Sequence, residues 1–119
     1  MTQSILLIDD SKLALRMVRR VVEAGLPGWN IIEASSGEEA LDVAARENID
    51  AATIDFNMRG MDGLETAERL RAIRPAAKLA LVTANVQDAI RKRADDLGIS
   101  FIAKPVTDAA ASQFLLALR

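Results

Sequence analysis

Three aspartates follow two short apolar runs, and carboxylates at such positions are candidates for metal binding or catalysis. Asp9 and Asp10 come directly after Ser4–Ile8, and Asp55 comes directly after Ala51–Ile54. If both runs are neighbouring strands of a parallel sheet, their carboxyl ends meet at one edge, where such sheets bind their ligands. Magnesium prefers one or two carboxylates together with waters and phosphate oxygens. The three acids therefore predict a magnesium site in which Asp55 is a candidate nucleophile.

A hydroxyl and an ammonium group follow two further apolar runs. Thr83 comes after Leu79–Val82, and Lys104 comes after Phe101–Ala103. A hydrogen-bond donor and a point charge suit a bound phosphoryl group. A carboxylate that becomes an aspartyl phosphate is an established form of covalent catalysis. Phosphorylation of Asp55 would add negative charge that needs new donors, which makes Thr83 the candidate for a switch.

Each of these side chains also has a purely structural explanation. An aspartate before a helix is a common N-cap, a threonine can end a strand, and a lysine at a surface can simply be solvated. Phe101 is most simply a core aromatic residue. Acids at two strand ends, with Thr83 and Lys104 at two others, favour one shared site over four unrelated ones.

Composition excludes several classes of function. The chain has 119 residues, 50% of them hydrophobic, with a net charge of -2 and neither cysteine nor histidine. One folded domain over 1–119 is expected, without disulfides, thiolate or imidazole metal sites, or a phosphohistidine of its own. The sequence shows no stripe of basic residues, so nucleic-acid binding is not expected. A signal peptide and a membrane-spanning segment are not expected either. The chain is therefore predicted to be soluble and cytoplasmic.

Strand and helix patterns alternate along the whole chain and position these residues. In the helix after Ser11, for example, apolar residues recur with helical spacing, and Ser36 with Glu39 forms a capping-box pattern. The expected strands are Ser4–Ile8, Trp29–Ala34, Ala51–Ile54, Lys78–Val82 and Ser100–Ala103. The expected helices run from Ser11 to Gly25, Ser36 to Arg46, Leu64 to Ile73, Val86 to Leu97 and Thr107 to Leu118. This alternation predicts an α/β fold with a parallel sheet and helices on both faces.

The chain resembles the receiver domain of two-component response regulators over essentially its whole length. The matching residues are the Asp9-Asp10 pair, Asp55-Phe56-Asn57-Met58, Met61-Asp62-Gly63, Thr83-Ala84, and Lys104-Pro105 three residues after Phe101. Each motif is weak alone, but their order, each after the right strand, is specific. The resemblance implies a flavodoxin-like five-stranded parallel sheet of order 2-1-3-4-5 with five helices on both faces.

The resemblance also implies a role for each site residue. Asp55 would be the phosphoacceptor. Magnesium would be bound by Asp10, Asp55 and the main-chain carbonyl of Asn57, with Asp9 contributing through a water. Lys104 would contact the phosphoryl group, Thr83 would hydrogen-bond to it, and Phe101 would move inward with Thr83. The Lys104-Pro105 bond is commonly cis in this family.

The implied function is that of a single-domain response regulator that switches partner binding and is not an enzyme beyond its own phosphorylation and dephosphorylation. The implied partners are a sensor histidine kinase or histidine phosphotransfer protein and an unknown downstream protein. Leu13 and Leu15 are expected to lie off the apolar stripe of the first helix, where the phosphodonor docks. Two alternatives remain: a receiver-like scaffold that is never phosphorylated, and an aspartyl-phosphate phosphatase, although Asn57 occupies the position of that enzyme's general acid.

The sequence departs from the common family pattern beside the phosphoacceptor. Arg59-Gly60 stands where a proline often follows the methionine. This change is expected to loosen the loop and to add a positive charge at the rim of the site. Asn57 and Asn85, each two residues beyond a site residue, occupy positions that tune the lifetime of the phosphoryl group in the family.

Overall fold

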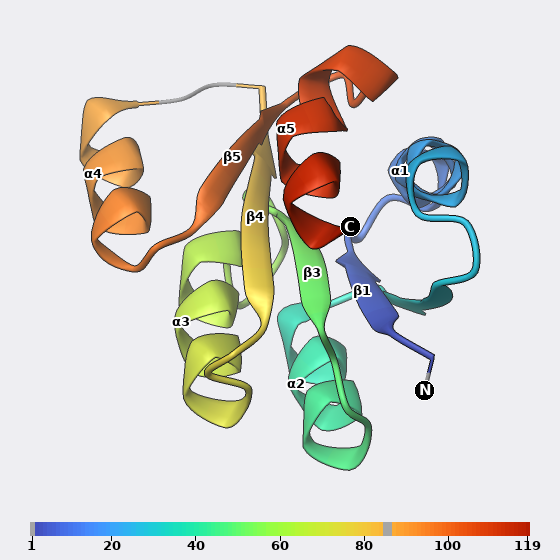
Figure 1. The fold of residues 1–119 in the computed structure, drawn as a ribbon. Helices are drawn as coiled ribbons and strands as arrows, with labels where there is room; N and C mark the ends of the chain where they lie inside the picture. The colour runs from blue at the N-terminus through green and yellow to red at the C-terminus, as the bar shows by residue number, and fades with distance from the viewer. Residues whose placement is uncertain (1, 85–86) are drawn as a thin grey trace.

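The computed structural model describes residues 2–84 and 87–119, and strands and helices alternate throughout them (Figure 1). The strands are β1 (Ser4–Ile8), β2 (Asn30–Ala34), β3 (Ala51–Asp55), β4 (Lys78–Thr83) and β5 (Ser100–Ala103). The helices are α1 (Lys12–Gly25), α2 (Gly37–Arg46), α3 (Gly63–Ile73), α4 (Asp88–Asp96) and α5 (Asp108–Leu118). No helix in the described ranges is long and apolar enough to span a membrane.

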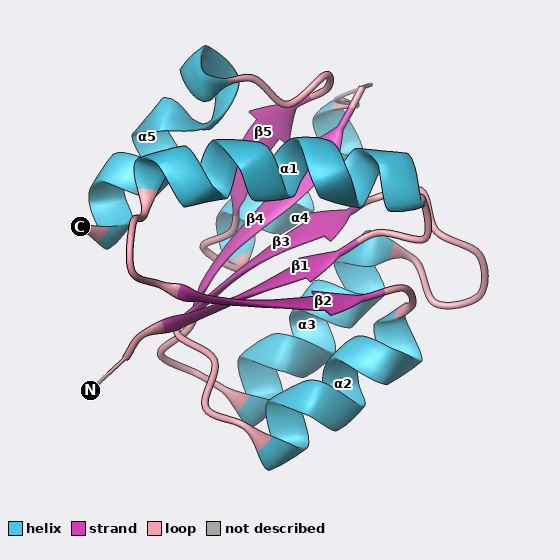
Figure 2. Ribbon diagram, turned by 90° about the vertical axis from the view of Figure 1, so that its right-hand side faces the viewer, coloured by secondary structure: helices cyan, strands magenta, loops and turns pink. Residues whose placement is uncertain are grey.

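The strands form one parallel sheet in the order β2-β1-β3-β4-β5. This confirms the predicted fold and strand order. Helices α1 and α5 cover one face, while α2 and α3 lie on the other (Figure 2). Every residue of the central strand β3 is buried, as expected for a parallel strand covered on both faces. The sheet order places the carboxyl ends of β1 and β3 side by side, which is what a shared acidic site requires.

Two apolar cores lie on the two faces of the sheet. Side chains from α2, α3 and α4 pack on one face, and side chains from α1 and α5 pack on the other. The strands contribute alternately to both, since successive side chains of a strand point to opposite faces: Leu6 and Ile8 belong to the first core, and Ile5 and Leu7 to the second. The strand ends are thereby fixed between two packed layers.

Helix starts agree closely with the capping signals in the sequence. The side chains of Ser11, Ser36, Asp62 and Thr107 each accept a hydrogen bond from a main-chain N–H in the first turn of the helix that follows. The Glu39 carboxylate accepts from the N–H of Ser35 at 2.5 Å rather than from Ser36, so the capping-box pattern is present with its return bond displaced by one residue.

Helix and strand boundaries differ from the expected ones at the functional edge. Asp55 and Thr83 are the last residues of β3 and β4 rather than the first residues of the following loops. Their main-chain groups are therefore held by the ladder while their side chains reach the edge. The expected helix start at Val86, and the lifetime position Asn85, lie outside the described residues.

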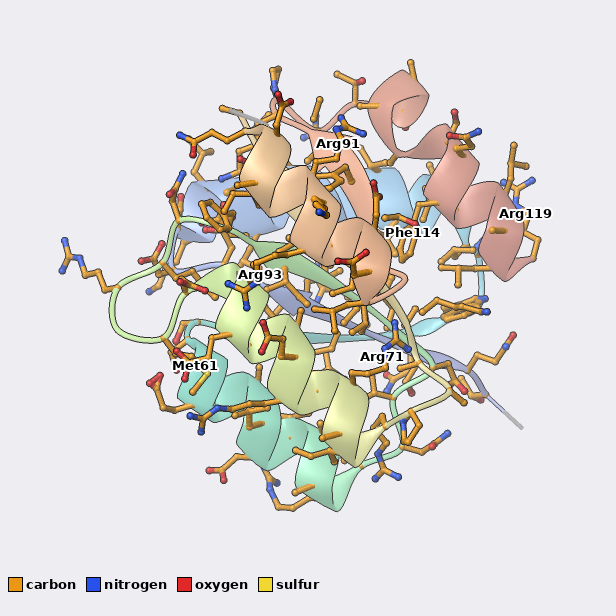
Figure 3. All side chains as sticks on the ribbon, turned by 90° about the vertical axis from the view of Figure 1, so that its left-hand side faces the viewer. Met61, Arg71, Arg91, Arg93, Phe114 and Arg119 are labelled. Carbon is orange, nitrogen blue, oxygen red and sulfur yellow. The ribbon has the colours of Figure 1, made fainter. Side chains whose placement is uncertain are left out.

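Helix α4 is the most thinly packed helix of the described chain. Ala94 is its single buried residue. An exposed ion pair between Arg93 and Glu68 connects it to α3, and Arg91 lies over the Phe101 ring of β5, 5.0 Å from the ring centroid. Both arginines project from α4 in Figure 3. Ala94, with Ile90 and Leu97 packed beside it, connects α4 to the core, and this small apolar contact leaves α4 among the less stable parts of the described fold.

Candidate functional site

The three predicted acids meet at the carboxyl edge of the sheet. Asp9 and Asp10 follow β1, and Asp55 ends the neighbouring strand β3. One carboxylate oxygen from each lies within 4.8 Å of the others. Asp9 and Asp55 are only 4% and 3% exposed, whereas Asp10 is open to solvent. The site is thus a buried pair of carboxylates with a third at its mouth.

Lys104 brings the only ammonium group among the described ion pairs of this cluster. Its Nζ lies 2.6 Å from Asp55 Oδ1 and 3.6 Å from Asp9 Oδ2. Its main-chain N–H donates to the carbonyl of Thr83 at 3.0 Å, which ties the start of the loop after β5 to the end of β4. The Lys104-Pro105 bond is cis. Within the part of the chain that the structure describes, the sheet edge therefore supplies one cation, the Lys104 ammonium, to the acidic cluster.

Burial and charge act in opposite directions on Asp55. Burial raises the pKa of its carboxyl group, the Lys104 ammonium lowers it, and the neighbouring Asp9 and Asp10 raise it again, so the pKa lies above its ordinary value. For Lys104, burial opposes the charged form, but the ion pairs with Asp55 and Asp9 outweigh burial and raise the pKa of the ammonium. A buried acid with a raised pKa in a cluster of like charges is typical of functional sites.

Acidification is expected to narrow the stability difference between the native chain and an Asp55→Asn variant when both are free of metal. The folded-state pKa of Asp55 is raised above an unfolded value of about 3.9, so the folded state binds more protons between the two values. The Asp55 contribution to stability therefore increases as pH falls through the folded pKa. At neutral pH the asparagine variant is expected to be the more stable protein.

Thermal unfolding in a chelator at a series of pH values between neutrality and about 4 tests this expectation, since the unfolded pKa is near the lower limit. An Asp42→Asn variant, which removes an exposed carboxylate of α2, provides the control and should show no such convergence. A difference between native and Asp55→Asn proteins that stays constant or widens on acidification would contradict the raised pKa.

Thr83 and Phe101, the two residues predicted to switch, lie on the neighbouring strands β4 and β5. Thr83 is 2% exposed at the end of β4, and β5 pairs with β4 through Leu81 opposite Phe101. Phe101 is half-buried against the core of the α2, α3 and α4 side. The two residues thus sit on adjacent strands, two register positions apart. Asn57 is exposed in the loop after β3, beside Asp55.

The two leucines predicted on the surface of α1 have different environments. Leu13 is 67% exposed, as expected. The expectation for Leu15 is wrong: it is 6% exposed and belongs to the core on the α1 face of the sheet, beside Glu33 and Ala34 at the end of β2. The sheet therefore covers a wider arc of α1 than the stripe read from the sequence. Met17, which has the helical spacing of the apolar stripe with Ala14, Val18 and Val21 in the sequence, is instead exposed.

An apolar groove of about 330 Å³ lies between α1 and the loop that carries Lys104. Its lining includes Ala14 and Met17 of α1, Ala84 after β4, and Pro105 with Val106. Sequence reasoning did not identify this groove, because it is formed by residues from three distant segments. Leu13, one residue before Ala14, is the exposed leucine of the same helix.

The residues present fit a divalent cation. The cluster offers three carboxylates, which are the hard oxygen ligands that magnesium accepts. In addition, Asp55 Oδ1 is buried without a hydrogen bond of ordinary geometry, although the Lys104 ammonium lies close to it. A buried carboxylate oxygen that is satisfied by a charge alone retains lone pairs for a further ligand.

Two main-chain features of the site were missed at the level of sequence. The Arg59 N–H donates to Asp10 Oδ2 at 3.2 Å. At Gly63 a Cβ atom would lie 2.3 Å from the carbonyl oxygen of Asp55 and 2.7 Å from the Cα of Phe56, so α3 begins in direct contact with the end of β3. The Met61-Asp62-Gly63 motif signals the glycine but not this contact, and no residue-type signal reveals a main-chain donor.

Comparisons with known proteins agree with this geometry. The family model of the response regulator receiver domain matches residues 5–115. A cyclic di-GMP phosphodiesterase of Thermotoga maritima is 32% identical over 87% of this chain and 27% of its own length. The nitrate/nitrite response regulator protein NarP of Escherichia coli is 38% identical over 66% of this chain and 37% of its own length.

Solved structures show the same fold. A CheY-like receiver domain from Methanospirillum hungatei has a TM-score of 0.88 at 23% identity and covers 99% of this chain and 94% of its own. A Burkholderia pseudomallei response regulator, described as holding a phosphorylated aspartic acid, a calcium ion and citrate, has a TM-score of 0.83 at 25% identity, covering 98% of this chain and 66% of its own.

The relatives also limit what the match conveys. The matched segment spans between 23% and 50% of the curated relatives' own lengths, so their named activities belong to longer proteins. The family match, in contrast, covers nearly all of this chain, and the acids, the hydroxyl and the lysine of the motifs meet at one edge of a sheet with the family's strand order. This chain belongs to the response regulator receiver domain family.

Proposed function

We propose that this chain accepts a phosphoryl group on Asp55 from the phosphohistidine of a sensor histidine kinase or histidine phosphotransfer protein, and that phosphorylation changes its binding to a downstream protein. The observation that carries the proposal is the position of Asp55: a buried carboxylate at a strand end, 2.6 Å from the Lys104 ammonium and clustered with Asp9 and Asp10. A carboxylate that is buried from solvent, with candidate metal ligands beside it, can act as a nucleophile.

In the proposed reaction a carboxylate oxygen of Asp55 attacks the phosphorus of the donor. A phosphorus–oxygen bond forms to Asp55 while the phosphorus–nitrogen bond to the donor imidazole breaks, and the imidazole nitrogen retains the electron pair. The Lys104 ammonium, already at the carboxylate, would pair with a phosphoryl oxygen. Charge-assisted contacts of this kind are about twice as strong as neutral hydrogen bonds, so Lys104 would stabilise the product.

Magnesium would neutralise charge on the phosphoryl oxygens when bound. Asp10, Asp55 and the main-chain carbonyl of Asn57 would hold it, with Asp9 contributing through a water. The Burkholderia structure, described as holding both a phosphorylated aspartic acid and a calcium ion, supports a site that combines an aspartyl phosphate with a divalent cation.

The apolar groove beside Lys104 suits the approach of a phosphodonor. Ala14 and Met17 of α1 line it together with Pro105, and Leu13 is exposed on the same helix. A partner seated there would be adjacent to Asp55, which phosphoryl transfer requires because the donor and acceptor atoms must come into line. Leu13 remains the candidate docking leucine, while Leu15 supports the helix from inside.

The experiment that tests the proposal is incubation of the native chain with acetyl phosphate and magnesium, followed by intact-mass measurement. We expect a mass increase of one phosphoryl group that is stable in acid, labile in base and lost when a chelator replaces magnesium. No mass increase under these conditions, with acetyl phosphate or with any histidine kinase of the host, would reject the proposal.

Replacing Arg91 by alanine is expected to increase the inward population of Phe101 in the unphosphorylated chain. Arg91 lies over the ring at 5.0 Å, and exposed cation–π contacts contribute about 0.5–1 kcal/mol. Loss of that contact should shift the equilibrium about two- to fivefold. The shift is measured by 19F NMR of fluorophenylalanine-labelled protein, in which Phe101 is assigned by substitution.

Lys92→Ala is the matched control, since Lys92 is an exposed cation of the same helix that does not stack on the ring in the described structure. An equal change in both variants would attribute the shift to net charge. No change in either would remove Arg91 from the proposed switch.

A further inference from the structure

Among residues 2–84 and 87–119, one main-chain donor contacts the Asp10 carboxylate. Its Oδ2 accepts the N–H of Arg59 at 3.2 Å, across 49 residues of sequence. Asp10 lies at the solvent-exposed mouth of the site, and within the described residues it forms no ion pair. Without the Arg59 amide, therefore, its carboxylate would be free to rotate into solvent.

The other two acids are fixed by different contacts. Asp9 is buried, accepts the N–H of Ser11 at 2.9 Å and lies 3.6 Å from the Lys104 ammonium. Asp55 is buried and contacts the same ammonium. Of the three acids, therefore, Asp10 is the one whose side-chain orientation depends on a contact with the loop after β3 in the described structure.

The same hydrogen bond restrains that loop. The N–H of Gly63 donates to the carbonyl of Phe56 at 3.0 Å, which closes the far end of the loop. Gly60, with a positive φ of 75°, permits the turn directly after Arg59, a conformation that other residues rarely adopt. Asn57 lies between Phe56 and Arg59, which form these two hydrogen bonds. The Arg59 N–H therefore restrains both the Asp10 carboxylate and the segment that carries the Asn57 carbonyl.

The Arg59 N–H is a donor that a receiver domain with proline at this position would not have. Proline has no main-chain N–H, so the proline that often stands at this point in receiver domains could not make the bond. The Arg59 side chain is exposed and contributes nothing to it. Arg59-Gly60 is expected from the sequence to loosen the loop, but the hydrogen bond from the Arg59 N–H to Asp10 restrains it.

We infer that the main-chain N–H of Arg59 is a positioning group for the magnesium site, holding the Asp10 carboxylate in the orientation that ligates the cation. The inference rests on the proposed function. A carboxylate has about four acceptor positions, so Asp10 can accept this bond and still bind a metal. Partners that orient metal ligands in this way typically contribute about 10–100-fold to metal affinity.

The test compares Arg59→Pro with Arg59→Ala by calorimetric titration of magnesium into the full chain. Both variants remove the guanidinium, but only the proline removes the N–H. We expect Arg59→Ala to bind within about twofold of the native chain and Arg59→Pro to bind about tenfold more weakly, at the lower end of the range for such groups. Equal affinity of the two variants overturns the inference.

A second substitution keeps the test decisive if the proline variant folds poorly. Incorporation of lactic acid at position 59 gives an ester that has the side chain of Arg59→Ala and carries an oxygen in place of the N–H. The ester should again weaken magnesium binding about tenfold relative to Arg59→Ala, and affinity equal to Arg59→Ala overturns the inference. If the native chain itself binds no magnesium, the proposed function fails and the inference fails with it, an outcome distinct from equal binding by the variants.

Discussion

Replacing Asp55 by asparagine is expected to abolish phosphoryl uptake from acetyl phosphate in the presence of magnesium. The asparagine amide has nearly the same shape but lacks the nucleophilic oxygen and the negative charge, so neither bond formation nor full metal ligation is possible. The fold should remain intact, since Asp55 adds its carboxylate to the site and not to either apolar core. Intact-mass measurement should show the native chain gaining one phosphoryl group and Asp55→Asn remaining at background.

Asp42→Asn is the control for nonspecific acyl phosphate chemistry, because Asp42 is an exposed carboxylate of α2. It should be phosphorylated as the native chain is. A mass increase in Asp55→Asn equal to that of the native chain would show that another residue accepts the phosphoryl group. Full retention of cellular activity by a verified unphosphorylated variant would instead favour a scaffold that uses the fold alone.

Replacing Gly63 by alanine is expected to lower both stability and phosphoryl uptake. The added Cβ would lie 2.3 Å from the carbonyl oxygen of Asp55 and 2.7 Å from the Cα of Phe56, and both contacts are with backbone. Helix α3 must therefore move away from β3. Overpacking of this kind destabilises by about 1–3 kcal/mol, and we expect the upper end of that range because no flexible side chain can yield. For a domain of this size that corresponds to a fall in Tm of roughly 12 °C or more.

Gly28→Ala separates steric overlap from backbone strain. Gly28 has a positive φ of 89°, but a Cβ there would meet no atom within 4 Å. Its replacement should cost about 1–2 kcal/mol through backbone conformation alone and leave phosphoryl uptake unchanged. If Gly63→Ala is no more destabilising than Gly28→Ala, and binds magnesium normally, the contact between α3 and β3 does not position the site.

The prediction of the fold from sequence succeeded where local signals and burial agree. Continuous apolar runs such as Ser4–Ile8 match strands buried on both faces, and the caps at Ser36 and Thr107 match helix starts. Prediction failed for Leu15, because helical periodicity shows a stripe but not how wide an arc of the helix its neighbours cover. The burial of Leu15 depends on the core that α1 forms against the sheet, where Leu15 lies beside Glu33 and Ala34 at the end of β2.

The sequence by itself determined the residue types of the site and the strands that they follow, since each motif is a short local pattern: Asp9-Asp10 after one apolar run, Asp55 at the end of another, and Lys104 before a proline. Only the tertiary structure decided the distances between them, because these depend on the sheet order that brings β1, β3 and β5 to one edge. It also decided the contacts made by the main chain. The Arg59 N–H at Asp10 and the closeness of Gly63 to β3 involve atoms that nearly every residue possesses, so only their position in space distinguishes them.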